Sequence, residues 1–326
     1  MQDIDINNLF VTASEQEKQR IQIIAEPKTY WQDAFERFKK NKVAVISAIF
    51  IIVMAAFAIL GPIFSSFQFD QQIKGSEYIL PFQNWQHPLG TDTLGRDNFV
   101  RLMVGSRISL SIGVLASFMV VIVGCIYGAI SGFFGGWIDS LMMRIVDVLY
   151  SIPTMLIIIL LQVVLKHPLD VFFTTYPALK IMDPGLLSIF ITLSLLYWMD
   201  MARMVRGQIL SLKQAEFVNA AKALGAKPWR IITKHLLPNC MGVIIVTAML
   251  SVPVAIFTEA FLSFVGLGVA SPMASLGSLA SDALGGIYSY PYMLIMPSII
   301  ISLIILTFNL VGDGLRDALD PRMKSK

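Results

Sequence analysis

Residues 214–238 read QAEFVNAAKALGAKPWRIITKHLLP, and this segment lies between two long apolar runs of the chain. Gly225 suits the left-handed backbone conformation that ends a helix, and Pro228 suits the first turn of the next helix. The stretch therefore predicts a helix, a sharp stop and a second short helix that ends at Pro238. A folded unit of this kind in a loop between two apolar runs is a candidate docking surface.

The first of these two helices is predicted to present one small apolar face. Phe217, Ala220 or Ala221, and Leu224 align along it at helical spacing. Because alanine side chains are small, such a face can seat closely in a partner's groove. An ordinary hairpin that only covers the helix bundle is the alternative, and the residues of the loop do not separate the two.

The rest of the chain has the composition of a membrane protein. Of its 326 residues, 56% are hydrophobic and 14% are charged, and its mean hydropathy is +0.69. Soluble domains carry about 25% charged residues. Six runs are long enough to cross roughly 30 Å of hydrocarbon, and there only helices satisfy every backbone amide. The predicted spans are 43–64, 108–133, 141–165, 186–204, 241–262 and 292–311.

The distribution of positive charge predicts the orientation. Most of the 25 lysines and arginines lie before the first predicted span, between the fourth and fifth, or after the sixth. Lysine and arginine are enriched on the cytoplasmic side of membranes, so both termini and the loop 205–240 are expected there. The predicted organisation is a leader 1–42, a first span 43–64, external loops 65–107, 166–185 and 263–291, a core 108–320 and a tail 321–326.

Two local patterns predict how parts of this bundle are arranged. Trp31, Phe35 and Phe38 recur at helical spacing among polar residues, which predicts an amphipathic helix on the inner membrane surface. A solvated basic flank that serves only topology is the alternative, and residues 1–27 show little periodicity. In the second span a glycine repeats every fourth residue and predicts a groove for a closely packed helix. These glycines are Gly124, Gly128 and Gly132.

Proline and cysteine are expected to act through packing. Pro153, Pro253 and Pro297 each fall inside a predicted span, where proline removes a helical hydrogen bond and permits a kink. Kinked helices suit a protein that opens and closes, but static membrane proteins have them too. Cys125 and Cys240 lack the spacing of metal ligands and are interpreted as small packing residues.

No motif of covalent chemistry is present. The chain lacks the GxxxxGK[ST] phosphate-binding loop, HExxH, GxSxG and paired Cys/His clusters. Its three histidines, His87, His167 and His235, all lie outside the predicted spans. The expectation is a protein that is not an enzyme and that binds no cofactor or metal itself.

Charges near the spans are costly in lipid and are expected to face protein or water. Arg144 with Asp147, and Asp200 with Arg203, are three residues apart and are expected to pair locally. Glu259 has no local partner. It is expected either to line a water-filled path or to bond to a neighbouring subunit.

The opening stretch resembles the cytoplasmic loop of the membrane subunits of bacterial ABC importers. That motif reads EAA, three residues, G, nine residues, I-x-L-P, and Asn219-Ala220-Ala221, Gly225 and residues 235–238 (HLLP) occupy its frame. Asn219 replaces the motif's glutamate and His235 its isoleucine. Any salt link that the family makes from the position of Asn219 is therefore in doubt.

Further segments are similar to the C-type permeases of peptide and nickel importers, and most of all to those of oligopeptide importers. Their order and spacing along the chain, from about residue 31 to 322, are specific to that group. The segments are HPLGTDTLGRD at 87–97, WMDMARMVRGQ at 198–208, FLSFVGLG at 261–268 and GDGLRDALDP at 312–321. The external insertion 166–185 is longer than expected for such a subunit and has no assigned role.

The resemblance implies a six-span, type I ABC importer permease that forms half of a heteromeric pore in the bacterial cytoplasmic (inner) membrane. A homologous B-type permease would complete the pore. Two ATPase subunits would bind ATP and Mg²⁺, and an external solute-binding protein would deliver peptide; no nucleic acid is involved. The residues expected to couple to the ATPases are Phe217, Asn219, Ala220, Ala221, Leu224, Gly225 and Trp229, and Glu259 is the candidate for the pathway.

Two rival functions remain. A dipeptide, nickel or glutathione importer would share the same signature segments. An autonomous channel or secondary transporter would work alone and often shows inverted repeats, which are not evident here.

Overall fold

The computed structural model describes residues 29–176 and 183–320, and its regular elements there are all helical. Six helices of this part of the chain are long and apolar enough to cross a membrane, which confirms the predicted all-helical, six-span class. These six segments are Lys42–Phe64, Asn98–Phe134, Thr154–Thr175, Pro184–Leu212, Pro228–Phe264 and Tyr292–Leu319. The leader before residue 29 and the tail 321–326 lie outside the described residues.

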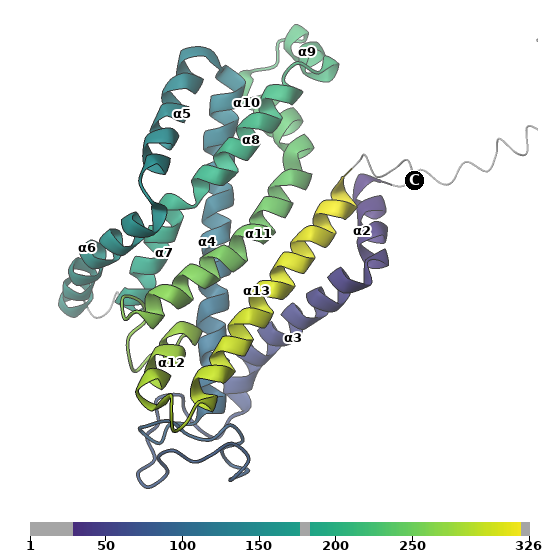
Figure 1. Ribbon diagram of the computed structural model, residues 1–326. Coiled ribbons are helices and arrows are strands. Elements are labelled where there is room, and N and C mark those ends of the chain that lie inside the picture. Colours follow the sequence, from purple (N-terminus) through teal and green to yellow (C-terminus); the bar gives the residue numbers. More distant parts are fainter. Residues whose placement is uncertain (1–28, 177–182, 321–326) are drawn as a thin grey trace, which may run out of the picture.

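The elements follow one another along the chain with short connections. Figure 1 shows α9 and α10 at one end of the bundle and the segment 65–97 at the opposite end. The helices are α2 (Tyr30–Lys40), α3 (Lys42–Phe64), α4 (Asn98–Phe134), α5 (Gly136–Ser151), α6 (Thr154–Thr175), α7 (Pro184–Leu196), α8 (Trp198–Leu212), α9 (Glu216–Ala223), α10 (Pro228–Ile231), the π-helix η3 (Ile232–Leu236), α11 (Leu237–Phe264), α12 (Leu276–Asp282), the 3₁₀-helix η4 (Ala283–Gly286) and α13 (Tyr292–Leu319).

The prediction that residues 141–165 form one continuous spanning helix is wrong. Helix α5 ends at Ser151 and α6 begins at Thr154, with Ile152 in an extended conformation (φ −98°, ψ 133°). A residue before proline is driven out of the helical region, so Pro153 separates two helices instead of kinking one. Pro253 and Pro297 do lie inside α11 and α13, as predicted.

Two predicted external loops contain more helix than expected. Helix α4 begins at Asn98, ten residues before the predicted start, because the Asp97 carboxylate caps it by accepting from the Val100 amide at 2.8 Å. Helix α6 continues to Thr175 and takes up half of the predicted insertion 166–185, of which residues 177–182 lie outside the described part. In the loop 263–291, α12 folds back against the bundle and buries most of its residues.

The predicted amphipathic helix is present as α2. A capping box at Thr29 begins it, and the side chains of Trp31 and Phe35 are exposed, as a helix on a lipid surface requires. The Tyr30 hydroxyl donates to the Leu319 carbonyl at 2.9 Å, which fastens α2 to the last turn of α13 (Figure 1). The position of α2 on the inner membrane surface stays a prediction.

The glycine groove of α4 receives α8. A β-carbon added at Gly124 would lie 2.5 Å from Cβ of Met201, and one at Gly132 would lie 2.9 Å from Cβ of Ile209. At Gly128 it would overlap the carbonyl oxygen of Ala202. The two backbones therefore approach more closely than any side chain at these positions would permit, which confirms the predicted groove.

The two cysteines are buried close to this contact. Cys125 of α4 and Cys240 of α11 belong to an apolar cluster that also contains Met201, Val205 and Ile209 of α8. Their surroundings match the packing role that the sequence suggested.

We expect Gly128→Ala to destabilise the chain by about 1–3 kcal/mol, because the added methyl group has no room against α8. The measurement is the unfolding temperature of the purified chain in detergent. Gly207→Ala is the matched control, since a β-carbon at Gly207 meets no atom within 4 Å. Equal unfolding temperatures for the two variants would contradict the importance of this contact.

Candidate coupling site

The helix–stop–helix unit predicted from the opening stretch is present. Helix α9 ends in a Schellman turn, in which the Gly225 amide donates to Lys222 O at 2.9 Å and the Ala226 amide to Ala221 O at 3.0 Å. Gly225 has φ +76°, the left-handed conformation that this turn requires. Pro228 then occupies the first turn of α10.

One side of the unit is held by the bundle. Val218 and Ala221 of α9 are buried in the same apolar cluster as the α4–α8 contact, together with Ile231, Ile232 and Leu236. Ala221 is 8% exposed and faces the bundle, so its predicted place on the docking face is wrong. Of the two alanines considered for that face, the structure exposes Ala220.

The opposite side of the unit faces solvent. Leu224 is 88% exposed, Trp229 60% and Phe217 40%, and Ala220, Asn219 and Gly225 are exposed as well. Large apolar side chains are seldom gathered on a free surface, so a contiguous group of them marks an interaction site. We call Phe217, Ala220, Leu224 and Trp229 the coupling face.

The unit continues without a break into a membrane span. Helix α10, the π-helical turn and α11 form one helical run, Pro228–Phe264. The π-helical turn lies directly before Pro238, which has no amide hydrogen to donate to the helix ladder. On the other side of the unit, Lys213 Nζ donates to the Gly132 carbonyl at 2.9 Å and ties the end of α8 to α4. The unit is therefore continuous with α11 on one side and follows directly on α8 on the other.

Charges near the spans pair between helices. Arg203 of α8 bonds Asp147 of α5 at 2.7 Å, and Tyr150 of α5 donates to Asp200 of α8. The predicted local pairs, Arg144 with Asp147 and Asp200 with Arg203, are therefore wrong. Helical neighbours in sequence were available, but the side chains reach across to the adjacent helix instead.

A second pair nearer the end of the bundle was not identified from the sequence. Arg206 of α8 bonds Asp139, in the first turn of α5, through two nitrogens at 2.5 and 2.6 Å. Hydrogen bonds from Arg206 hold the pKa of the Asp139 carboxyl below its usual range. Bidentate pairs of this kind fix geometry, so α5 and α8 are tied together beside the unit.

Glu259 is placed in the interior of the bundle. Its side chain is fully buried, and it accepts from Ser109 Oγ of α4 at 2.6 Å and from Ser263 Oγ at 2.8 Å. Ser109 also accepts from the Leu276 amide at 3.3 Å, so the group joins α4, α11 and α12. Because the Glu259 side chain is fully buried, it neither lines a water-filled path nor lies on a surface for a neighbouring subunit. Both predicted roles are therefore wrong.

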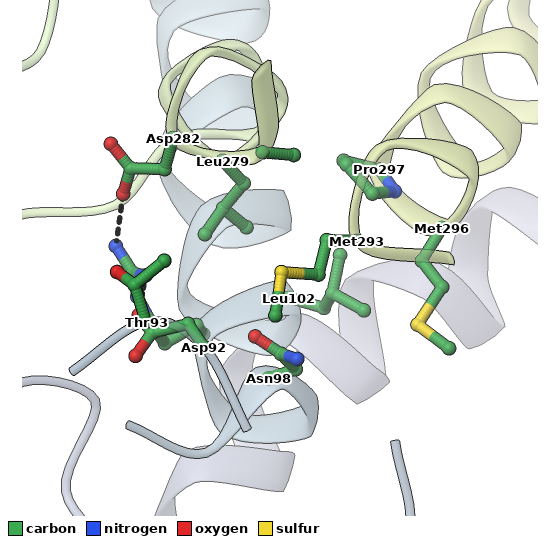
Figure 2. A pocket seen from close by; sticks show the side chains of 11 residues that line it. Asp92, Thr93, Asn98, Leu102, Leu279, Asp282, Met293, Met296 and Pro297 are labelled. Carbon is green, nitrogen blue, oxygen red and sulfur yellow. Dashed lines mark hydrogen bonds and ion pairs between the residues drawn. The ribbon is translucent and has the colours of Figure 1, made fainter. Parts of the chain in front are cut away.

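The opposite end of the bundle is held by an ionic network in which the side chains of Asp92, Arg96 and Arg101 are buried. Arg96 Nε donates to Asp92 at 2.7 Å, Arg101 bonds the same carboxylate, and Arg101 Nη2 reaches Asp282 of α12 at 3.0 Å. Figure 2 shows a small pocket between these helices, with Asp282 and Asp92 on one side of it and Met293 and Met296 of α13 on the other. The segment 87–97 was recognised by resemblance alone. Its bond to α12 had no local signal in the sequence, because Asp282 lies 186 residues from Arg96.

These features define a class of protein: a multi-pass helical membrane protein of the transport-permease kind, with a protruding helical unit fixed to its spans. Among the described residues no group of three His, Cys, Asp or Glu side chains is placed to hold a metal ion. The chain belongs to the family of binding-protein-dependent transport system inner membrane components, which matches residues 121–325. Residues 29–81 match the N-terminal membrane domain of oligopeptide transport permease C. It is thus a permease subunit of an ABC importer.

Named relatives cover nearly the whole chain. The oligopeptide transport system permease protein OppC of Bacillus subtilis is 44% identical over 99% of this chain and all of its own length. The dipeptide transport system permease protein DppC of the same organism is 43% identical over 97% of this chain and 93% of its own. The Escherichia coli K12 OppC is 41% identical, over 91% of this chain and 93% of its own.

A solved structure shares the fold. A chain of the MetNI methionine ABC transporter, solved in inward-facing conformations, superposes with a TM-score of 0.50. The superposition covers 67% of this chain and 96% of that one at 18% identity.

We expect Glu259→Ala to lower the unfolding temperature of the purified chain. The substitution leaves the buried Ser109 and Ser263 hydroxyls without their acceptor, at about 1–3 kcal/mol for each unsatisfied group. Glu259→Gln keeps the size and an acceptor oxygen, so it should retain most of the stability. A Gln variant of unchanged stability that has lost transport would contradict a purely structural role.

Proposed function

We propose that this chain forms one half of an ATP-driven import route for peptides, coupled to ATPase subunits through the coupling face. The observation that carries the proposal is the combination of exposed apolar side chains on the unit with its unbroken helical continuation into α11. The chain carries no phosphate-binding loop of its own. Energy therefore reaches it mechanically, through a partner that seats on this surface.

The substrate class follows from the relatives. Permeases for oligopeptides and dipeptides resemble the chain almost equally, at 44% and 43% identity. The match of residues 29–81 to the oligopeptide permease domain favours oligopeptides. Dipeptide import is the second candidate, and nickel or glutathione import in the same architecture has weaker support.

The proposed assembly has four kinds of partner. A homologous B-type permease completes the pore, two ATPase subunits bind ATP and Mg²⁺, and an external binding protein delivers the peptide. The chain itself is non-catalytic and binds no cofactor. Both termini and the coupling face lie on the cytoplasmic side of the bacterial inner membrane, a side supported by the distribution of lysine and arginine.

The small size of Ala220 sets the sharpest test of the coupling face. We expect Ala220→Trp to leave the chain folded and inserted, yet to reduce peptide uptake and peptide-stimulated ATP hydrolysis to about a tenth or less. If the tryptophan ring weakens binding of the ATPase subunit by roughly 1.4 kcal/mol, the affinity falls tenfold, which is enough for that loss. The measurements are ATPase co-purification and uptake in proteoliposomes that contain all subunits.

Two variants serve as controls. Ala220→Ser keeps the side chain at this position of the coupling face small and should retain uptake. Ala221→Trp overpacks a buried site and should lower the unfolding temperature instead, since overpacking costs about 1–3 kcal/mol. Normal uptake by an inserted Ala220→Trp chain would refute the coupling face. Competition between labelled pentapeptide and dipeptide in the same assay separates the two substrate candidates.

A further inference from the structure

The helix–stop–helix unit is rich in positive charge. Residues 214–238 contain four lysines and arginines and a single acidic residue, Glu216. Lys227, Arg230 and Lys234 recur at intervals of three and four residues, so they lie along one side of α10 and the π-helical turn that follows it. All three are exposed. We call these three residues the basic stripe.

The basic stripe differs from the other cations at this end of the bundle, which are satisfied inside the chain. Arg203 and Arg206 of α8 bond Asp147 and Asp139 of α5, and Lys213 donates to a backbone carbonyl of α4. Among the residues that the structure describes, no ion pair involves the basic stripe. Like charges at this spacing destabilise a helix slightly, so the stripe adds no stability to the unit itself.

The basic stripe begins inside the coupling face. Lys227 lies between Leu224 and Trp229 in the chain, in the turn that separates α9 from α10, and Arg230 follows Trp229 directly. Leu224 and Trp229 are 88% and 60% exposed. A partner that covers these two apolar side chains therefore also meets the two cations beside them.

This arrangement places chemical demands on the partner. Protein interfaces commonly have an apolar centre and a polar rim. A cation that is taken out of water without a counter-charge opposes binding, whereas a carboxylate placed opposite it speeds the encounter and fixes the register. Apolar side chains flanked by unpaired cations thus fit an apolar groove with carboxylates at its edge.

We propose that the ATPase subunit that binds the coupling face carries acidic side chains where it meets Lys227 and Arg230. The inference rests on the proposed function, since it adds the chemistry by which the same partner is recognised. Aspartate or glutamate side chains at the edge of the ATPase groove pair with the basic stripe. An ATPase with lysine or arginine at that edge is rejected by repulsion between like charges.

Anionic lipid head groups are the other source of negative charge for exposed lysine and arginine. The burial of α9 favours protein over lipid. Val218 and Ala221 pack on the cluster that joins α4 and α8, so the coupling face points away from the helices that cross the membrane. Figure 1 shows α9 and α10 at one end of the bundle.

The test measures how fast the ATPase subunits of the same transporter bind the complete permease pair in a neutral detergent, which removes anionic lipid. The variants are Lys227→Glu and Arg230→Glu. Lys222→Glu is the matched control, because it makes the same change of charge on an exposed residue of the unit. Lys222 lies about 200° around α9 from Ala220 of the coupling face, at about 100° per residue.

We expect each stripe variant to associate about fivefold more slowly than the native chain at about 0.05 M salt, because charges at the rim of an interface act mainly on the association rate. The difference should nearly vanish at about 0.5 M salt, where charges are screened over a few ångströms. Lys222→Glu should associate at the native rate, and all three variants should keep the native unfolding temperature.

Native association rates for both stripe variants at low salt would overturn the inference. An equal slowing by Lys222→Glu would overturn it as well, since the net charge of the unit would then set the rate. Slowing that occurs only after anionic lipid is added would assign the stripe to the membrane surface and not to the ATPase. A native permease pair that binds no ATPase subunit at either salt concentration would refute the proposed function, so the two failures are distinguishable.

Discussion

The close approach of α4 and α8 is the contact on which the other arrangements depend. Lipid tails are as apolar as leucine, so helices in a bilayer associate through close packing and not through expulsion of water. Gly124, Gly128 and Gly132 permit that packing because each has a backbone or β-carbon of α8 where a side chain would stand. The contact sets the position of α8, and α8 leads directly into the unit that carries the coupling face.

Hydrogen bonds and ion pairs then join the packed helices to one another. At the α9 end, Asp139 and Asp147 hold α5 against α8, and Lys213 secures the connection to α4. At the opposite end, the Asp92 network joins the segment 65–97 to α4 and α12. Glu259 lies between these ends and joins three helices with serine hydroxyls. Most of these bonds join different helices, so they form only in the assembled bundle, which makes the arrangement specific.

The spans and the helix–stop–helix unit can be predicted from the sequence because their signals are local. Apolar length marks a span, Gly225 marks a helix end, and a four-residue glycine repeat marks a packing groove. Partner choice is not local. Asp147 has Arg144 one turn away, yet it bonds Arg203, which is 56 residues distant in sequence. The burial of Ala221 in place of Ala220 likewise depends on the angle at which α9 meets the bundle, which no residue in the loop specifies.

The bond between Tyr30 and Leu319 joins residues 289 positions apart, at the two ends of the described chain. Gly314 of α13 also packs on Ala44 of α3 near the same corner. On the ribosome, α2 and α3 emerge before α13, which carries the surface that receives them. Chains fold progressively during synthesis, so the first hairpin enters the bilayer without its final neighbour. The corner closes only once α13 has been made, and a chain that terminates before α13 lacks the helix that holds α2 in place.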